Sequence, residues 1–184
     1  MIAKGFSGSA TGTGLARSAP MTNDTLPLRS RFANAETASR AALIAQPMIE
    51  QALRDPAVSG LGVLHLVMLD PLMTPATTSF GEAVLHEHSI GDRSRWDVDY
   101  AAYARAKARL SWQHAMDSRR LQSLSPHRLT DGDSLLWGGV WLDGLVVAAS
   151  GAMPSWDEAF SFCVAGLWRS LAWQAAEAAR GAKP

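Results

Sequence analysis

The chain has 184 residues and a mass of 19.7 kDa, the size of one ordinary domain, and 47% of its residues are hydrophobic. Its 17 Lys and Arg residues balance 17 Asp and Glu residues, so the overall basic character of a nucleic-acid-binding domain is missing. The single cysteine, Cys163, excludes an internal disulfide and a cysteine-rich structural zinc site.

The first part of the chain has the composition of a leader. It is rich in Gly, Ser, Thr and Ala, which bury too little apolar surface to offset the entropy of ordering. It lacks the apolar core of about 7–15 residues that a secretory signal needs, and no run reaches the roughly 18 apolar residues of a membrane span. We therefore expect a flexible leader over residues 1–33, a single domain over residues 34–180, and a cytoplasmic protein without membrane or nucleic-acid partners.

A helix and a strand are predicted first. Asn34 can cap a helix that ends near Arg54, and Pro47 inside it is expected to kink or restart it. Between Gly60 and Leu69 the chain is apolar at both alternating positions. This pattern is typical of a central strand that is covered on both faces.

A second strand is predicted over residues 79–88, where His86 and His88 share one face by the two-residue period. The neutral imidazoles of these two residues could ligate heme or a metal ion. A solvated sheet face explains them equally well. Because no third ligand follows at a fixed spacing, we predict no metal site.

A long helix is predicted over residues 97–121, with one stripe of mostly small side chains that suits close packing on a sheet. The neighbouring stripe is polar and aromatic, and it contains Tyr100, Tyr103, Lys107, Ser111 and His114. Lys107 could bind a carboxylate, and His114, two turns away, could act as an acid or base. A solvated stripe with an extended lysine is the alternative interpretation.

The C-terminal part predicts a hairpin and a helix. Apolar runs over residues 135–142 and 145–151 are joined by Asp143-Gly144, a preferred pair for a tight hairpin turn. The final helix is expected to be capped by Ser155, with Asp157 near the positive end of the helix dipole and Cys163 on the inward side. The predicted fold class is α/β (α+β), an antiparallel sheet flanked by helices in the order α-β-β-α-β-β-α.

Short segments of the C-terminal half occur in a familiar order: Gly138-Gly139-Val140, Asp143-Gly144-Leu145-Val146-Val147-Ala148, Ser150-Gly151, Asp157-Glu158 and Ala165-Gly166-Leu167. In this order the chain resembles the GlcG/HbpS-like family, also called the heme-binding or heme-degrading domain. The C-terminal domain of PduO-type proteins is related to that family. The helical segment from Tyr103 to Arg109 and the strand from Gly60 to Asp70 look like the family's corresponding parts.

The resemblance implies a profilin-like domain, a homo-oligomer, and heme as a cofactor. It also implies that Gly138, Gly139, Ser150 and Gly151 contribute to the ligand site, together with Tyr103 and the histidines above. Residues 71–78 replace the short glycine-containing turn that the family usually has between its first two strands. Because this region is expected to line a pocket, the identity of the ligand is the least transferable property.

The leading hypothesis is a protein that binds or senses a small molecule, with heme as the ligand that the resemblance implies. The alternative is an enzyme of small-molecule catabolism in which Lys107 and His114 perform acid–base chemistry on an anionic organic substrate. No nucleophile elbow, P-loop or dinucleotide fingerprint supports the enzyme. A third hypothesis is a structural subunit that binds a partner through a surface rich in tryptophan, of which the chain has seven.

Overall fold

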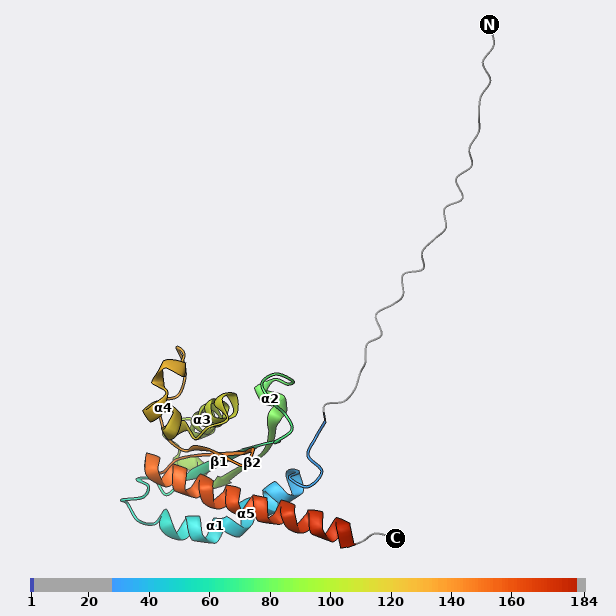
Figure 1. The fold of residues 1–184 in the computed structure, drawn as a ribbon. Helices are drawn as coiled ribbons and strands as arrows, with labels where there is room; N and C mark the ends of the chain where they lie inside the picture. The colour runs from blue at the N-terminus through green and yellow to red at the C-terminus, as the bar shows by residue number, and fades with distance from the viewer. Residues whose placement is uncertain (2–27, 182–184) are drawn as a thin grey trace.

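In a computed structural model, which describes Met1 and residues 28–181, helices cover both faces of an antiparallel four-stranded sheet (Figure 1). The strands follow the spatial order β2-β1-β4-β3, and they are β1 (Leu64–Leu69), β2 (Val84–Ile90), β3 (Gly139–Leu142) and β4 (Leu145–Ser150). The helices are α1 (Ala35–Ala52), α2 (Phe80–Ala83), α3 (Tyr100–His114), α4 (Ser118–Leu124) and α5 (Pro154–Gly181). The predicted α+β fold class is confirmed.

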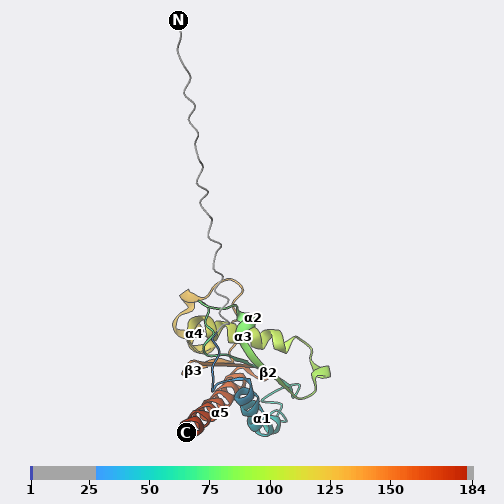
Figure 2. The same ribbon diagram turned by 90° about the vertical axis from the view of Figure 1, so that its right-hand side faces the viewer.

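The two faces of the sheet have separate cores. Helices α1 and α5 cover one face and α3 covers the other, as Figure 2 shows from the side. Leu66 and Met68 of β1 pack in the core under α1 and α5, whereas Val67 packs against Ala104 of α3. All six residues of β1 are therefore buried, as predicted for a central strand.

Helix α1 begins and continues as its sequence predicts. The Asn34 side chain accepts a hydrogen bond from the Thr37 amide at 3.0 Å, and the Thr37 hydroxyl accepts one from the Asn34 amide at 3.1 Å. Pro47 lies inside the helix without ending it. Pro47 and Leu43 are both exposed, so water can bond the carbonyl that the proline leaves without a donor.

The second strand begins later than predicted. Ser79 and Glu82 form a capping box, with the Ser79 amide donating to the Glu82 carboxylate at 3.0 Å, so residues 80–83 form the short helix α2. Strand β2 starts only at Val84. The expected strand over residues 79–88 is thus wrong at its start, because local capping competes with the strand pattern.

The long helix predicted over residues 97–121 is divided in two. Asp99 caps α3 by accepting from the Ala102 amide at 2.9 Å, and Ala115 ends it in the left-handed conformation with φ of 49°. Helix α4 starts after this break. The alanine-rich sequence carries no glycine or proline at the break, so the end of α3 was not predictable from local preference.

The predicted hairpin is confirmed at its turn. Asp143 and Gly144 have φ of 51° and 91°, the two positive values that a tight type I′ turn requires. Strand β3 begins at Gly139 rather than at residue 135, because Gly138 has φ of 124° and turns the chain away from the sheet.

Helix α5 starts at Pro154, one residue before the predicted cap, in the position where proline suits a helix start. The buried face of α5 includes Phe160, Val164 and Trp168, whereas Cys163 is exposed. The prediction of an inward Cys163 is wrong. No helix among the described residues is long and apolar enough to cross a bilayer. The leader predicted over residues 1–33 lies mostly outside the described residues.

Candidate functional site

The ammonium group of Lys107 is buried between α3, β4 and α5. Its Nζ donates to the Asp157 carboxylate at 2.7 Å, to the Ala149 carbonyl at 3.0 Å and to the Ser150 hydroxyl at 3.3 Å. The side chains of Lys107 and Asp157 are each only 2% exposed. Three acceptors match the three N–H bonds of an ammonium, so the geometry fits a charged lysine.

Two glycines make room for this ion pair. A Cβ atom on Gly139 would lie 2.6 Å from the Ser111 hydroxyl and would also overlap the backbone of Lys107. A Cβ atom on Gly138 would lie 2.8 Å from the Asp157 Cβ. Strand β3 can therefore pass this close to α3 and α5 only because both positions lack a side chain.

Asp157 is held at the first turn of α5. Its second carboxylate oxygen accepts a hydrogen bond from the Ala152 amide at 2.9 Å. Burial raises the pKa of Asp157 to about 6, although Lys107 and the amides of Ala152 and Gly151 act in the opposite direction. Burial lowers the pKa of Lys107, and Asp157 opposes that shift. The three acceptors around Nζ favour a charged Lys107, and burial moves the pKa of Asp157 toward neutral pH.

A pocket of about 270 Å³ opens above this pair, and we call it the Lys107 pocket. It is lined by Gly60, Val98, Tyr100, Tyr103, Lys107, Leu136, Ser150, Gly151, Ala152, Met153, Pro154 and Asp157. The Tyr100 hydroxyl donates to Asp97 at 2.7 Å, and burial raises the pKa of Tyr100 to about 12, so this phenol stays protonated. The pocket thus combines a charged floor with aromatic and backbone walls.

Several of the predicted site residues come together here. Tyr103, Lys107, Ser150 and Gly151 line the Lys107 pocket, and Gly138 and Gly139 lie directly behind the lysine. For Asp157, the sequence predicted only a role at the start of the final helix. Its pairing with Lys107, which is 50 residues away, depends on the tertiary fold, so no local pattern could reveal it.

The histidines of β2 lie elsewhere, on the face of the sheet that α1 covers. The His88 ring nitrogen Nε2 is 2.9 Å from the Gln46 side-chain oxygen, and the rings of His86 and His88 stack at 6.1 Å. Burial lowers the pKa of both residues, which favours neutral imidazoles. The buried Nε2 of His86 has no hydrogen-bond partner among the described residues.

His114 also lies outside the Lys107 pocket. It is the last residue of α3 and lies near Arg128 and Asp133, and burial is the main cause that lowers its pKa. The structure therefore does not bring His114 to the Lys107 ammonium. In this structure, Lys107 and His114 therefore do not form the acid–base pair that the sequence suggested.

Heme does not fit the Lys107 pocket. No histidine lines it, and its volume of about 270 Å³ lies just below the roughly 300–1,000 Å³ of sites that hold drug-sized ligands. Within residues 28–181, no group of three or more His, Cys, Asp or Glu side chains could hold a metal ion. The chemistry of this pocket is that of a buried cation with a carboxylate partner.

Comparisons with known proteins show a distant structural similarity. No family model matches the chain, and no curated protein does. The crystal structure of the Klebsiella pneumoniae protein ORFY, described as a DUF336 protein, is similar with a TM-score of 0.46 and 14% sequence identity. The match covers 83% of this chain and 99% of that one.

Proposed function

We propose that this protein binds a small organic anion whose carboxylate enters the Lys107 pocket. The observation that carries the proposal is the buried Lys107 ammonium, which lies beside Asp157 on the floor of a pocket of about 270 Å³. Burying a charged ammonium lowers the stability of the folded state through its desolvation penalty. Ionisable groups buried beside a pocket are typical of functional sites.

Charge balance decides how the anion binds. With Lys107 and Asp157 both ionised the floor is neutral, so a second carboxylate there would leave one uncompensated negative charge. Asp157, with a pKa of about 6, can take up a proton when the anion arrives. The ligand carboxylate then replaces Asp157 as the counterion of Lys107, and binding is coupled to proton uptake.

The walls favour a ligand with a short apolar body. Tyr103, Val98 and Met153 offer aromatic and aliphatic surface around the opening, and the chain from Gly151 to Pro154 closes one side. Such a pocket suits a monocarboxylate with a flat or branched group, because the carboxylate sets the orientation and the apolar body supplies contact area.

Benzoate is the probe that tests this site. We expect saturable shifts of the Gly151 and Ala152 amide resonances when benzoate is titrated, and an affinity that rises as the pH is lowered from 8 toward 6. The rise is at most about tenfold per pH unit, because one proton is taken up. Benzyl alcohol has the same ring without the charge and is expected to show no such pH dependence.

The matched variant is the double substitution Lys107→Met with Asp157→Leu, which replaces the ion pair by apolar side chains of similar length. We expect it to fold and to lose benzoate binding. Unchanged benzoate affinity in this double variant, or shifts that map away from the Lys107 pocket, would overturn the proposal.

Heme is a separate proposal that rests on the sequence resemblance, and it attaches to His86 and His88 rather than to the Lys107 pocket. A hemin titration followed in the Soret region tests it. If these residues ligate heme, a saturable Soret shift disappears in the His86→Ala and His88→Ala variants. A titration without a Soret shift would show that this chain does not bind heme, whatever the resemblance implies.

A further inference from the structure

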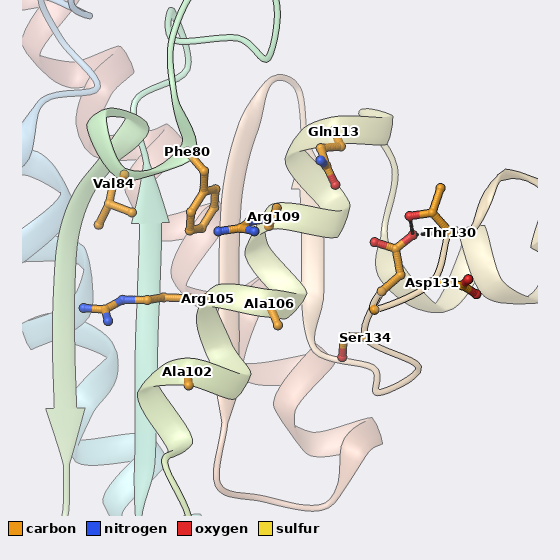
Figure 3. Close-up of a pocket in the computed structure, with 13 residues that line it drawn as sticks. Phe80, Val84, Ala102, Arg105, Ala106, Arg109, Gln113, Thr130, Asp131 and Ser134 are labelled. Atoms are coloured by element: carbon orange, nitrogen blue, oxygen red, sulfur yellow. Dashed lines mark hydrogen bonds between the residues drawn. The ribbon is translucent and has the colours of Figure 1, made fainter.

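A second pocket, of about 900 Å³, lies on the outer side of α3 (Figure 3), and we call it the α3 groove. Its lining comes from three segments: the start of α2 and β2, the outward face of α3, and the loop over residues 130–134. None of its lining residues lines the Lys107 pocket. The α3 groove and the Lys107 pocket are therefore separate sites.

One wall of the α3 groove holds the positive charge of Arg109. The Arg109 guanidinium stacks on the Phe80 ring at 4.8 Å from its centroid, and Figure 3 shows the two side chains against each other. No carboxylate or other acceptor among the described residues contacts Arg109. Stacking fixes the plane of the guanidinium and leaves its N–H edges open, which is the arrangement that binds a carboxylate in two-point fashion.

The neighbouring arginine is already neutralised. Arg105, one turn earlier on α3, donates two hydrogen bonds to the Glu87 carboxylate, at 2.6 and 2.7 Å. Between these arginines the helix presents the small side chain of Ala106 to the groove. Arg109 is consequently the residue of this wall that can receive an anionic group.

The opposite wall is acidic. Asp133 accepts from the Thr130 amide at 2.7 Å and from the Thr130 hydroxyl at 3.0 Å, which closes the loop into a turn. Asp131 lines the groove from the same loop and has no hydrogen-bond or ion-pair partner among the described residues. Figure 3 places Thr130 and Asp131 on the side away from Phe80 and Arg109. Within residues 28–181, the groove thus has a cation without an ionic partner on one side and an anion without one on the other.

We infer that the α3 groove binds a short peptide with free ends. Its terminal carboxylate pairs with Arg109, its terminal ammonium pairs with Asp131, and its body lies beside Ala106 of α3. Complementary charge at both ends fixes the direction of the peptide, and the volume of about 900 Å³ leaves room for more than a single amino acid.

Trialanine tests this inference by calorimetric titration, with trialanine amide and N-acetyl-trialanine as probes that each lack one end charge. We expect trialanine to bind about tenfold more tightly than either blocked probe, the size expected for one charge-assisted contact. Arg109→Gln should weaken trialanine and the N-acetyl probe and leave the amide unchanged. Asp131→Asn should weaken trialanine and the amide and leave the N-acetyl probe unchanged.

Two controls keep the result specific. Arg40→Gln removes an exposed arginine from α1, on the far face of the sheet, and should change no affinity. The Lys107→Met and Asp157→Leu double variant should bind trialanine normally, which separates this inference from the benzoate site. Absence of saturable trialanine binding, or equal effects of Arg109→Gln and Asp131→Asn on all three probes, would overturn the inference.

Discussion

At the scale of single residues, the stability of the fold depends on the charges of Lys107 and Asp157. Each is almost fully buried, and each provides a partner that the other needs. The sequence predicted Lys107 as a site residue, because it stands on a polar stripe of an otherwise small-residue helix. It could not predict Asp157 as its partner, because acidic residues at the first turn of a helix are common for reasons of capping alone.

Lys107→Met is expected to lower the free energy of unfolding by about 3–5 kcal/mol at neutral pH, since it leaves the Asp157 carboxylate buried without its cation. The loss should be smaller at pH 6 than at pH 8. Without Lys107 the pKa of Asp157 rises further, so at pH 6 the residue is protonated and no unpaired charge remains. Adding Asp157→Leu should recover most of the stability.

Urea denaturation of the wild type, the single variant and the double variant measures these differences. A double variant that is as unstable as Lys107→Met alone would show that the cost lies in lost packing, and that the buried charge is not its cause.

At the scale of elements, the close approach of β3 to α3 depends on Gly139. A methyl group there would overlap the Lys107 backbone and the Ser111 hydroxyl. We expect Gly139→Ala to destabilise the protein by about 1–3 kcal/mol, as overpacking does in a tight core. Gly166→Ala is the matched control, because it lies inside α5 with nothing within 4 Å of a new Cβ.

Gly166→Ala should stabilise the helix by about 0.5–1 kcal/mol, since alanine restricts the unfolded chain and suits a helix. Thermal unfolding of both variants, followed by circular dichroism, shows whether each substitution raises or lowers the melting temperature. If Gly139→Ala melted at or above the wild-type temperature, β3 would not be held against α3 as described.

Helix and strand boundaries that depend on nearby residues could be predicted, whereas boundaries that depend on tertiary contacts could not. The hairpin turn was predictable because Asp143 and Gly144 favour positive φ by their own chemistry. The end of α3 was not, because Ala115 has no such preference and adopts φ of 49° within its tertiary surroundings. The start of β2 required recognising a capping box at Ser79 in a segment that otherwise alternates like a strand.

At the scale of the whole molecule, the sequence did not predict the order of the strands in the sheet or the sheet face on which each helix packs. The order β2-β1-β4-β3 places the C-terminal hairpin beside β1, and this brings Ser150 and Gly151 to Lys107. The glycines and Ser150 that the resemblance implied lie together around Lys107. The resemblance could not show that His86, His88 and His114 lie away from that group, since this follows from which face of which element each residue occupies.

The stability of the whole molecule should depend on pH through His65. This residue of β1 is 4% exposed, and burial lowers its pKa to about 4, ahead of the opposing effect of Glu87. Because the pKa is lower in the folded state than its ordinary 6.5, the stabilising contribution is complete above 6.5 and is lost as the pH falls toward 4. The full loss is about 3–4 kcal/mol.

Comparison with His65→Gln isolates this contribution. Glutamine can bond Ser89, as the His65 ring does at 2.8 Å, and it does not titrate. The difference in unfolding free energy between the wild type and the variant should shrink or reverse between pH 6.5 and 4. A constant difference across that range would mean that His65 is not the group responsible.

The outward position of Cys163 on α5 has a practical consequence for handling the protein. It is the single thiol of the chain, it is exposed, and α5 covers the sheet face away from α3 and the α3 groove. Two copies can therefore become crosslinked through this residue when a preparation is oxidised, without any change in either pocket. The same thiol gives one defined attachment point for a fluorophore or a nitroxide, so ligand titrations can be followed from a reporter that touches neither site.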